Sequence, residues 1–430
     1  MSLGVHLKPC KNTAEATPIT VPVPQRVTLT LSTFRGSVNA PIVQAGDHVD
    51  VGQVIAPPKG GLAVPVHATV SGTVESIGVL RNSDGSQTPC INIKSDGAQT
   101  VWEGVKAPTV TNLDEFVAAV KDAGLTGLGG AGFPTWAKLA AGTEILLLNG
   151  SECEPYCTAD YSLMCSDPKA VMEGAELVRK YVGIQKIIIG IKDTNVKAVE
   201  AMKSAAAKYQ GVEVKTFTSF YPLGAEKMLI QQATGRIVPR GKLPKDVGVI
   251  VLNVGTCAAI AQYINTGMPL VNKTVTLDGS AVKNPGLAVA PIGTPIKELF
   301  DAIGGFSEEP SKVLMGGPMM GIAFPSLDAP LLRQNNAFLA LNAKDAKLPD
   351  ESACIRCGRC VRHCPMNLMP AGLVRARKAE NGALLDKLMV DLCIECGVCS
   401  YVCPAKIDLV ASHRLAKPML RAYQQEVKSK

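Results

Sequence analysis

Two cysteine-rich stretches near the C-terminus decide the organisation of this chain: Cys354-Ile-Arg-Cys-Gly-Arg-Cys-Val-Arg-His-Cys-Pro365 and Cys393-Ile-Glu-Cys-Gly-Val-Cys-Ser-Tyr-Val-Cys-Pro404. Both have the spacing C-x2-C-x2-C-x3-C-P. Cysteines at x2 spacing fall on neighbouring loop positions, so their thiolates can surround one face of a compact inorganic group. The proline redirects the chain after the fourth cysteine. Because the pattern occurs twice in full, the two stretches are predicted to have the same role.

This spacing is that of bacterial ferredoxins, which bind 4Fe-4S clusters, and the fourth cysteine of each run there ligates the other cluster. Two clusters make the chain an electron carrier. A pair of zinc knuckles is the alternative, but zinc sites take their four ligands at paired spacings. The predicted ligand sets are Cys354, Cys357, Cys360 and Cys403 for one cluster, and Cys393, Cys396, Cys399 and Cys364 for the other.

Length, composition and charge narrow the class of protein. A chain of 430 residues should hold roughly three domains, and its 47% hydrophobic residues suffice for large cores. Residues 351–430 contain 13 Lys/Arg against 7 Asp/Glu. Such a basic end suits an acidic electron-transfer partner or an anionic membrane, but it equally suits plain solvation and compensation of cluster charge. Nucleic-acid binding is not expected, because no basic stripe with interleaved aromatics is present.

The cysteine content indicates a reducing compartment. Of the 14 cysteines, those in the two runs need reducing conditions for iron binding, so disulfides are not expected. The N-terminus lacks a signal-peptide core, and the most apolar stretch, 247–264, is interrupted by polar residues. We therefore expect a chain that is soluble by itself. Cys153 and Cys157 flank a Glu-Pro turn and are either redox-active or small buried fillers.

The hydrophobic pattern divides the remainder of the chain into further predicted domains. Residues 1–110 show short alternating strands, and two half-motifs indicate a barrel-sandwich hybrid domain, in which Lys59 lacks the setting of a carrier lysine. Alternating strands and helices over 111–265 predict a doubly wound α/β domain. The predicted remainder is a β-grasp module at 266–330, a linker at 331–350, the ferredoxin domain at 351–410 and a basic helix at 411–430.

A glycine loop and an acidic stretch mark a binding site in the α/β domain. The loop contains Gly127, Gly129, Gly130 and Gly132, whose backbone amides could approach a phosphate closely. Its spacing departs from that of dinucleotide-binding folds, so alone it is equally a flexible turn. The stretch 149–156, Asn-Gly-Ser-Glu-Cys-Glu-Pro-Tyr, follows a buried apolar strand, and ligands of such sheets bind at the carboxyl ends of strands.

These residues resemble the flavoprotein subunit of respiratory complex I. Residues 127–138, GLGGAGFPTWAK, are similar to its FMN- and NADH-binding loop, and NGSECEPY is similar to its acidic NADH-binding stretch. The later flavin-binding segments of that family are matched less closely, with Ala225 and Gly255 in place of acidic residues. The resemblance implies FMN and NAD(H) as cofactors. The residues it implies at the site are Gly127, Gly129, Gly130, Gly132 and Lys138 for phosphate, Phe133 for the nicotinamide, Asn149, Glu152 and Glu154 for the nucleotide, and Tyr221, Glu226, Asn253 and Thr256 for the flavin.

The full domain order resembles the C-subunit family of Rnf electron-transport complexes. The stretches CIRCGRCVRHCPMNLMP and CIECGVCSYVCPAKIDL carry that resemblance most closely. It implies a fold of barrel-sandwich hybrid, complex-I-like FMN domain, β-grasp (SLBB-like) module and two-cluster 4Fe-4S ferredoxin domain. It also implies a peripheral subunit on the cytoplasmic face of the cell membrane, working with integral membrane and ferredoxin-like subunits. The implied activity is ferredoxin:NAD+ oxidoreduction coupled to Na+ or H+ transport.

A flavin belongs between the nicotinamide and the clusters, because it exchanges electrons in pairs or singly. No side chain is therefore predicted to act as a catalytic acid or base. The nearest alternative is a soluble cobalamin reductase or a proline-reductase-linked electron carrier of the same architecture. The other is an electron-relay or assembly subunit that binds no nucleotide.

Overall fold

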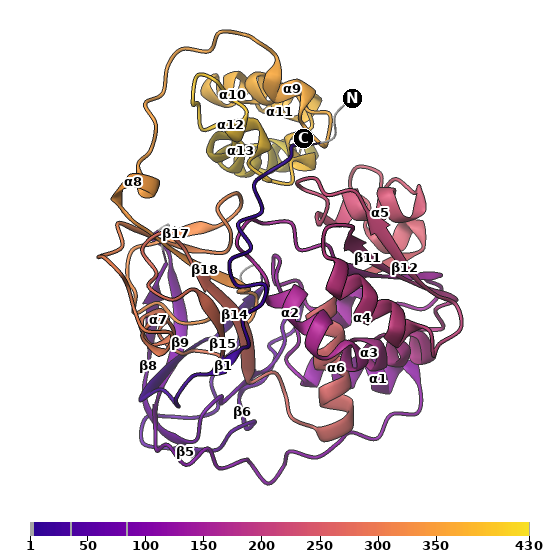
Figure 1. Cartoon of the computed structure of the whole chain (residues 1–430), viewed down its shortest axis with the longest axis vertical. Coiled ribbons are helices and arrows are strands. Elements are labelled where there is room, and N and C mark those ends of the chain that lie inside the picture. Colours follow the sequence, from indigo (N-terminus) through magenta and orange to yellow (C-terminus); the bar gives the residue numbers. More distant parts are fainter. Residues whose placement is uncertain (1–3, 35–36, 83–84, 430) are drawn as a thin grey trace.

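The computed structural model describes residues 4–34, 37–82 and 85–429, so residues 1–3 and 430, which belong to the predicted terminal segments, lie outside the described residues. Figure 1 shows three regions: an α/β domain, a β-rich region beside it, and a helical module that carries both cysteine runs. The two large regions provide the walls of the site described below, and the module packs against them from one end.

The N-terminal region contains an antiparallel four-stranded sheet and two small hairpins. Its strands are β2 (Arg26–Thr30), β3 (Ser32–Phe34), β4 (Ser37–Val38), β5 (His48–Val49), β6 (Val54–Ala56), β7 (Val66–His67), β8 (Gly72–Arg81) and β9 (Gln87–Ser95). The sheet order is β2-β9-β8-β5. Alternation along β2 buries Val27 and Leu29, as expected of a strand with one face in the core. β8 and β9 form a long hairpin that extends to Arg81 and Gln87.

The α/β domain is built on a parallel sheet with the order β12-β11-β10-β13. Its elements are α1 (Leu113–Asp122), η1 (Thr135–Lys138), β10 (Ile145–Gly150), α2 (Ala159–Ser166), α3 (Pro168–Val182), β11 (Lys186–Lys192), α4 (Val196–Ala206), β12 (Val212–Phe217), α5 (Glu226–Thr234), η2 (Pro244–Val247), β13 (Val249–Asn253) and α6 (Val254–Thr266). Leu146 and Leu148 pack into one core and Leu147 into another, so both faces of the sheet are covered. This explains the uninterrupted apolar run that predicted β10. The sequence analysis did not predict α2, β12 and α5.

A six-stranded mixed sheet follows, in the order β1-β15-β14-β18-β16-β17. Its elements are β1 (Ile19–Thr20), β14 (Asn272–Asp278), β15 (Gly286–Pro291), α7 (Ile296–Ala302), β16 (Lys312–Met315), β17 (Ile322–Phe324), β18 (Ala337–Leu341) and α8 (Ala343–Ala346). The first strand comes from the N-terminal segment and pairs in parallel with β15. The chain start therefore belongs partly to this sheet, and not only to the domain predicted at 1–110.

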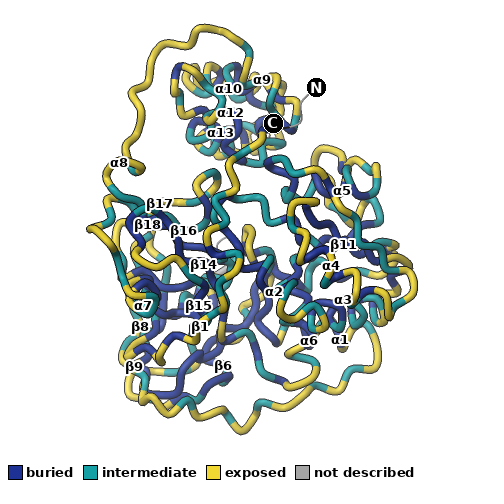
Figure 2. The backbone as a smooth tube through the Cα atoms, viewed as in Figure 1, coloured by how far each residue is buried: buried dark blue, intermediate teal, exposed yellow. Residues whose placement is uncertain are grey.

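The predicted linker at 331–350 is wrong in its first half. Within it, β18 lies near the centre of the sheet, parallel to β14 and antiparallel to β16. Phe338 and Leu339 are fully buried. The run Ala-Phe-Leu-Ala-Leu has the length of a buried strand, but polar neighbours on both sides hid it. Only the part after β18 behaves as a connection, and Figure 2 shows it as mostly exposed.

The C-terminal module is helical, and each of its two cysteine runs contains a short helix. Its helices are α9 (Arg359–Arg362), α10 (Pro370–Lys378), α11 (Gly382–Lys387), η3 (Val390–Leu392), α12 (Val398–Tyr401) and α13 (Leu409–Ser429). The predicted basic tail at 411–430 is not separate from the ferredoxin domain at 351–410, because α13 begins within that domain and packs on α10 and α11. Ala416 and Leu420 of α13 are buried in the core of the module.

Across 4–34, 37–82 and 85–429, no helix combines the length and apolar character needed to span a bilayer.

The contact between α3 and α6 generates a stability prediction. A Cβ added at Gly174 would lie 1.8 Å from the carbonyl oxygen of Cys257, so Gly174→Ala must push the two helices apart. Overpacking of this kind costs about 1–3 kcal/mol, which exceeds the gain of up to about 1 kcal/mol from replacing a helical glycine. We expect a clearly lower melting temperature by calorimetry. The matched control is Gly78→Ala, where a Cβ meets nothing within 4 Å. Equal melting temperatures for both variants would contradict the packing.

Candidate flavin cavity and cysteine sites

A cavity of about 490 Å³ opens beside the edge strand β13 of the parallel sheet. It runs from Lys245, before β13, to the carboxyl ends of β10 and β13 at Asn149 and Asn253. Its size lies within the range of cofactor sites. The predicted site residues on its wall are Gly127, Gly129, Gly130, Gly132, Phe133, Lys138, Asn149, Glu152, Glu154, Glu226 and Asn253.

The glycine loop forms a tight turn over this cavity. The amide of Gly127 donates to the carbonyl of Phe133 at 2.7 Å, which closes the loop. Gly129 and Gly132 have φ values of +75° and +69°, a conformation that side chains rarely adopt. A Cβ at Gly130 would meet nothing within 4 Å, so its backbone is open to the cavity. The loop therefore has the exposed backbone that close approach of a phosphate requires.

Two predicted flavin contacts do not line the cavity. Thr256 is buried, and its hydroxyl accepts a hydrogen bond from the amide of Leu128 at 3.2 Å, so it supports the glycine loop from behind. Tyr221 is 1% exposed and points away from the cavity. Its backbone pairs with Val5 of the N-terminal segment at 2.9 and 2.8 Å, which fixes that orientation. The sequence placed both residues near the site but could not give the side on which they lie.

An ion pair and an aromatic pair also line the cavity. Lys138 donates to Glu226 at 2.7 Å and to the carbonyl of Val251 at 3.0 Å. Phe133 meets Phe34 edge to face, with ring centroids 5.2 Å apart. Phe34 belongs to the N-terminal region, outside the α/β domain. The cavity is therefore shared between domains.

The two predicted nucleotide carboxylates are already engaged with backbone amides. Glu152 accepts from the amides of Asp160 and Tyr161 at 3.3 and 3.4 Å, at the start of α2. Glu154 accepts from the amides of Met319 and Met320 at 3.0 and 2.9 Å, in the turn between β16 and β17. Burial raises the pKa of Glu154, and these hydrogen bonds oppose that rise. Glu154 thus ties the cavity to the six-stranded sheet.

A buried polar network around Asp160, which the sequence did not predict, lies at the wall of the cavity. Asp160 accepts from Asn253 at 2.7 Å and from Asn336 at 3.1 Å, and Asn336 accepts from Lys273 at 2.8 Å. Burial and then the Glu152 charge raise the pKa of Asp160 to about 7. Burial lowers the pKa of Lys273 to about 8, against the attraction of Asp160. In the sequence, the one feature that could have indicated this network is an asparagine directly before an apolar run, as at Asn336.

The cysteines gather across the two runs. Cys364 of the first run lines a small apolar cavity together with Cys393, Cys396 and Cys399 of the second. Burial raises the pKa of Cys396 to about 12, and Cys393 and Cys364 add to the rise. This group is called the inner set below.

The complementary group is Cys354, Cys357, Cys360 and Cys403, called the outer set. Burial raises the pKa of Cys360, and Cys403 and Cys354 raise it further, so a thiol of the second run lies close to the first run. These are the two groups for which the exchange of fourth cysteines was predicted, and their ligation of iron stays a prediction. In the described part of the chain, no three His, Cys, Asp or Glu side chains converge as a single metal ion would require.

Both runs adopt the same backbone conformation. Arg356 and Glu395, at equivalent positions, have φ values of +55° and +56°, and Gly358 and Gly397 follow at +72° and +76°. Each left-handed pair bends the chain around its cysteines. Paired bends of this kind leave successive amides pointing inward, which favours an anionic group such as a thiolate-bound cluster.

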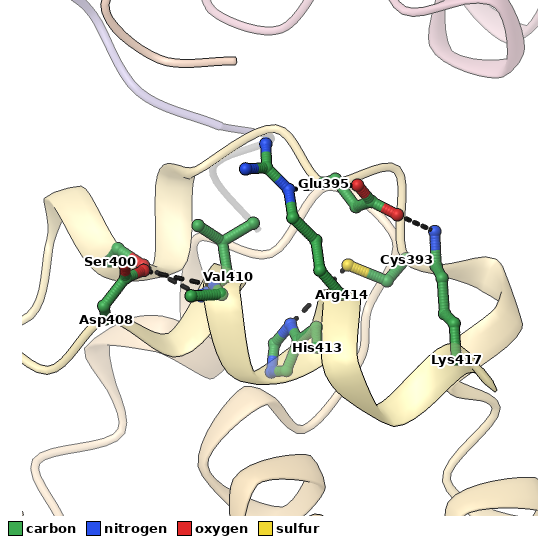
Figure 3. Close-up of polar contacts among 9 residues, drawn as sticks. Cys393, Glu395, Ser400, Asp408, Val410, His413, Arg414 and Lys417 are labelled. Atoms are coloured by element: carbon green, nitrogen blue, oxygen red, sulfur yellow. Dashed lines mark hydrogen bonds and ion pairs between the residues drawn. The ribbon is translucent and has the colours of Figure 1, made fainter. Parts of the chain in front are cut away.

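Helix α13 holds the loop of the inner set in place (Figure 3). Glu395 pairs with Lys417 and, at 3.1 Å, with Arg414. His413 is 1% exposed, with Nδ1 3.6 Å from the sulfur of Cys393 and Nε2 3.1 Å from the carbonyl of Pro370. The loop is thus fixed by residues that sequence reasoning had assigned to a simple basic tail.

The module packs directly against the cavity wall. The hydroxyl of Tyr221 donates to the carbonyl of Cys396 at 2.8 Å and lies 3.3 Å from Glu154. Cys153, which lines the cavity, packs in one apolar cluster with Tyr221 and Cys396. Arg240 of the α/β domain pairs with Asp386 and Asp391 of the module at 2.7 and 2.8 Å. These contacts place the inner set next to the cavity. We call the packed group of Tyr221, Cys153 and Cys396 the seam.

The network around Asp160 generates a pH prediction. The pKa of Asp160 is about 7 in the folded protein and about 4 in an unfolded chain. Between these values the folded state binds more protons, so the unfolding free energy falls as pH rises. Asp160→Asn mimics the protonated carboxyl and removes this loss. We expect melting temperatures of wild type and variant to be similar near pH 5 and to diverge towards pH 7.5, with the wild type lower. The control Asp193→Asn, on the surface, should follow the wild type, and parallel profiles for Asp160→Asn would refute the assignment.

Known protein families match this chain in the same order as its predicted domains. The matching families are described as the RnfC barrel sandwich hybrid domain at residues 1–98, the Nuo51 FMN-binding domain at 120–262, the SLBB domain at 274–323 and the 4Fe-4S dicluster domain at 353–407. The predicted fold class is therefore confirmed. A solved NAD+-reducing [NiFe]-hydrogenase has a similar fold, with a TM-score of 0.52 and 21% identity over 72% of this chain and 63% of its own.

Relatives are similar over most of the chain. The C subunit of the proton-translocating ferredoxin:NAD(+) oxidoreductase complex of Clostridium ljungdahlii is 40% identical over 86% of this chain and 82% of its own. The C subunit of the Na(+)-translocating complex of Acetobacterium woodii is 42% identical over 81% of both chains. The chain belongs to the family of C subunits of ion-translocating ferredoxin:NAD(+) oxidoreductase (Rnf) complexes.

Proposed function

We propose that this chain passes electrons between NAD(H) and a ferredoxin-type partner through one FMN and two 4Fe-4S clusters. The observation that carries the proposal is the seam, where the hydroxyl of Tyr221 joins the cavity wall to the backbone of Cys396. A flavin site and a cluster site in separate domains could not exchange electrons efficiently without such contact, because electron-transfer rates fall steeply with distance.

The residues of the cavity fit FMN. The open backbone at Gly130 and the left-handed turns at Gly129 and Gly132 would receive the phosphate, with Lys138 supplying positive charge nearby. Asn149 and Asn253, at the strand ends, offer polar groups for the remainder of the cofactor. Bound there, FMN supplies the conversion between paired and single electrons.

The same cavity would receive NAD(H). Phe133 presents an aromatic ring for the nicotinamide, beside the glycine loop. Glu152 and Glu154 keep oxygen lone pairs after accepting backbone hydrogen bonds, so each could also accept from ribose hydroxyls. The partly buried Cys153 packs with Tyr221 and Cys396 in one apolar cluster between the cavity and the module.

The cysteine groups fit two cubane clusters. We assign the inner set, Cys364, Cys393, Cys396 and Cys399, to the cluster beside the cavity, and the outer set to the second cluster. Electrons would then pass from the cavity to the inner cluster, the outer cluster and a partner. The direction follows the potentials of the cofactors, which the residues do not fix.

The setting proposed for the chain is that of its relatives' complexes. Those relatives are named as subunits of proton- or Na+-translocating assemblies. We infer that this chain is a peripheral subunit on the cytoplasmic face of the cell membrane. Its partners there would be integral membrane subunits and a ferredoxin-like subunit.

Cofactor content tests the proposal. Protein purified without oxygen should contain about eight irons, about eight acid-labile sulfides and about one FMN per chain, as two 4Fe-4S clusters and one flavin require. Addition of NADH should bleach both the flavin and the cluster absorption. A preparation with four irons or fewer, or with zinc instead, would contradict the assignment, as would full cofactor content without bleaching by NADH.

The seam can be tested separately with Tyr221→Phe. The variant loses the hydroxyl that donates to the carbonyl of Cys396 and contacts Glu154, so the seam is held less firmly. A bond worth about 1 kcal/mol corresponds to roughly a fivefold change in a rate constant. Iron and FMN content and flavin reduction by NADH should stay as in wild type, while stopped-flow reduction of the clusters slows about fivefold.

The matched control is Tyr181→Phe, which removes a similar bond, from the hydroxyl to the carbonyl of Val110 at 2.9 Å, on the far face of the α/β domain. Cluster reduction in that variant should match wild type. Equal rates in Tyr221→Phe and wild type would show that the hydrogen bond has no part in the transfer.

A further inference from the structure

The two cysteine sets differ sharply in exposure. Cys354 and Cys357 of the outer set are exposed, whereas Cys396 and Cys399 of the inner set are buried. In Figure 1, α9, which carries Cys360 of the outer set, lies near the top of the module on the side away from the sheets. The outer set therefore offers the route by which electrons leave the chain for another molecule.

Exposed cations surround the outer set. Arg356, Arg359, Arg362 and Lys406 are exposed, and we call these four residues the arginine rim. Lys406 belongs to it because the chain beside it pairs with the start of the first run, Ser352 donating to Ala405 at 2.9 Å. No ion pair involves a rim residue in the described part of the chain.

Three acidic groups elsewhere in the module are held in ion pairs. Asp386 and Asp391 pair with Arg240, and Glu395 pairs with Arg414 and Lys417. Two exposed carboxylates, Asp350 and Glu351, precede the first run, so the cations still outnumber the acids there. The four cations of the arginine rim thus lie beside the exposed cysteines without an ion-pair partner among the described residues.

Cluster binding does not account for the rim. The second run has the same backbone bends, yet Glu395, Val398 and Tyr401 stand where the first run has Arg356, Arg359 and Arg362. At the second run the nearby cations, Arg414 and Lys417, are paired with Glu395, whereas the cations of the first run are unpaired in the part of the chain that the structure describes. The arginines are specific to the exposed run.

The rim also has an apolar centre. Ile355 is 68% exposed and lies between Cys354 and Arg356, and Val361 is 39% exposed on α9 between Cys360 and Arg362. A small apolar contact inside a charged border is typical of transient complexes, in which charge speeds encounter and the small area keeps binding weak.

We propose that the arginine rim, with Ile355 at its centre, is the docking surface for an acidic iron–sulfur electron carrier. This inference rests on the proposed function, which supplies the clusters. In each encounter the outer cluster loses one electron and an oxidised cluster of the carrier gains it, and no bond is made or broken. Reduced carrier reverses the same step.

Charge reversal tests this surface. The variant carries Arg356→Glu, Arg359→Glu and Arg362→Glu. The matched control carries Lys378→Glu, Arg421→Glu and Lys428→Glu, which reverse three exposed cations on α10 and α13 and change the net charge equally. The probe is an acidic two-cluster bacterial ferredoxin in its oxidised form. Each protein is reduced with dithionite and desalted without oxygen, so the assay does not depend on NADH or FMN.

Stopped-flow absorption should give a wild-type second-order rate that falls roughly tenfold between low and high salt, as expected for steering between opposite charges. The rim variant should be about tenfold slower at low salt with little salt dependence, while the control stays within about twofold of wild type. Iron content and bleaching by dithionite show separately whether the clusters are present. Loss of the clusters would therefore contradict the proposed function and would not test the rim.

Three results would overturn the proposal. The rim variant could react like wild type, or both variants could slow equally, which would reduce the effect to net charge. The third result would be binding of the rim to a membrane. In that case wild type would sediment with vesicles containing anionic phosphatidylglycerol, and the rim variant would not, although it keeps its rate with ferredoxin. That outcome would assign the rim to a membrane surface.

Discussion

The hydrogen bond from Tyr221 to the backbone of Cys396 is the contact on which the proposed electron path depends. Electron transfer needs cofactors held close together, and this bond lies where the cavity wall meets the loop of the inner set. Its surroundings keep it in place. Val5 fixes the backbone of Tyr221, and Glu154 joins its hydroxyl to the turn at Met319 and Met320.

The seam explains why so many domains contribute to one cavity. The α/β domain supplies the glycine loop and strand ends, the N-terminal region supplies Phe34, and the six-stranded sheet supplies Asn336 and Met320. The salt bridges of Arg240 then hold the module against this assembly. The exposed connection after β18 adds little to that position, so the seam and these ion pairs carry it.

Much of this organisation is readable from the sequence, because local patterns carry it. The cysteine spacing predicted both groups of neighbouring cysteines, whose ligation of iron stays a prediction, and the apolar run at β10 predicted a strand with polar residues at its carboxyl end. Long-range placement was not readable. The sequence could not show that Tyr221 turns towards the module, that Thr256 supports the glycine loop, or that the apolar run at β18 is a central strand. Asp160, Lys273 and Asn336 meet only after three separate segments pack together.

Diffraction at the iron absorption edge from anaerobically grown crystals tests the central claim most directly. The account predicts two four-iron peaks, one bounded by Cys364, Cys393, Cys396 and Cys399 beside the flavin cavity, and the other by Cys354, Cys357, Cys360 and Cys403 at the surface. A first run that ligates one cluster with all four of its own cysteines would contradict it. An inner cluster that lies away from the cavity, with further protein between it and the seam around Tyr221, would also contradict the account.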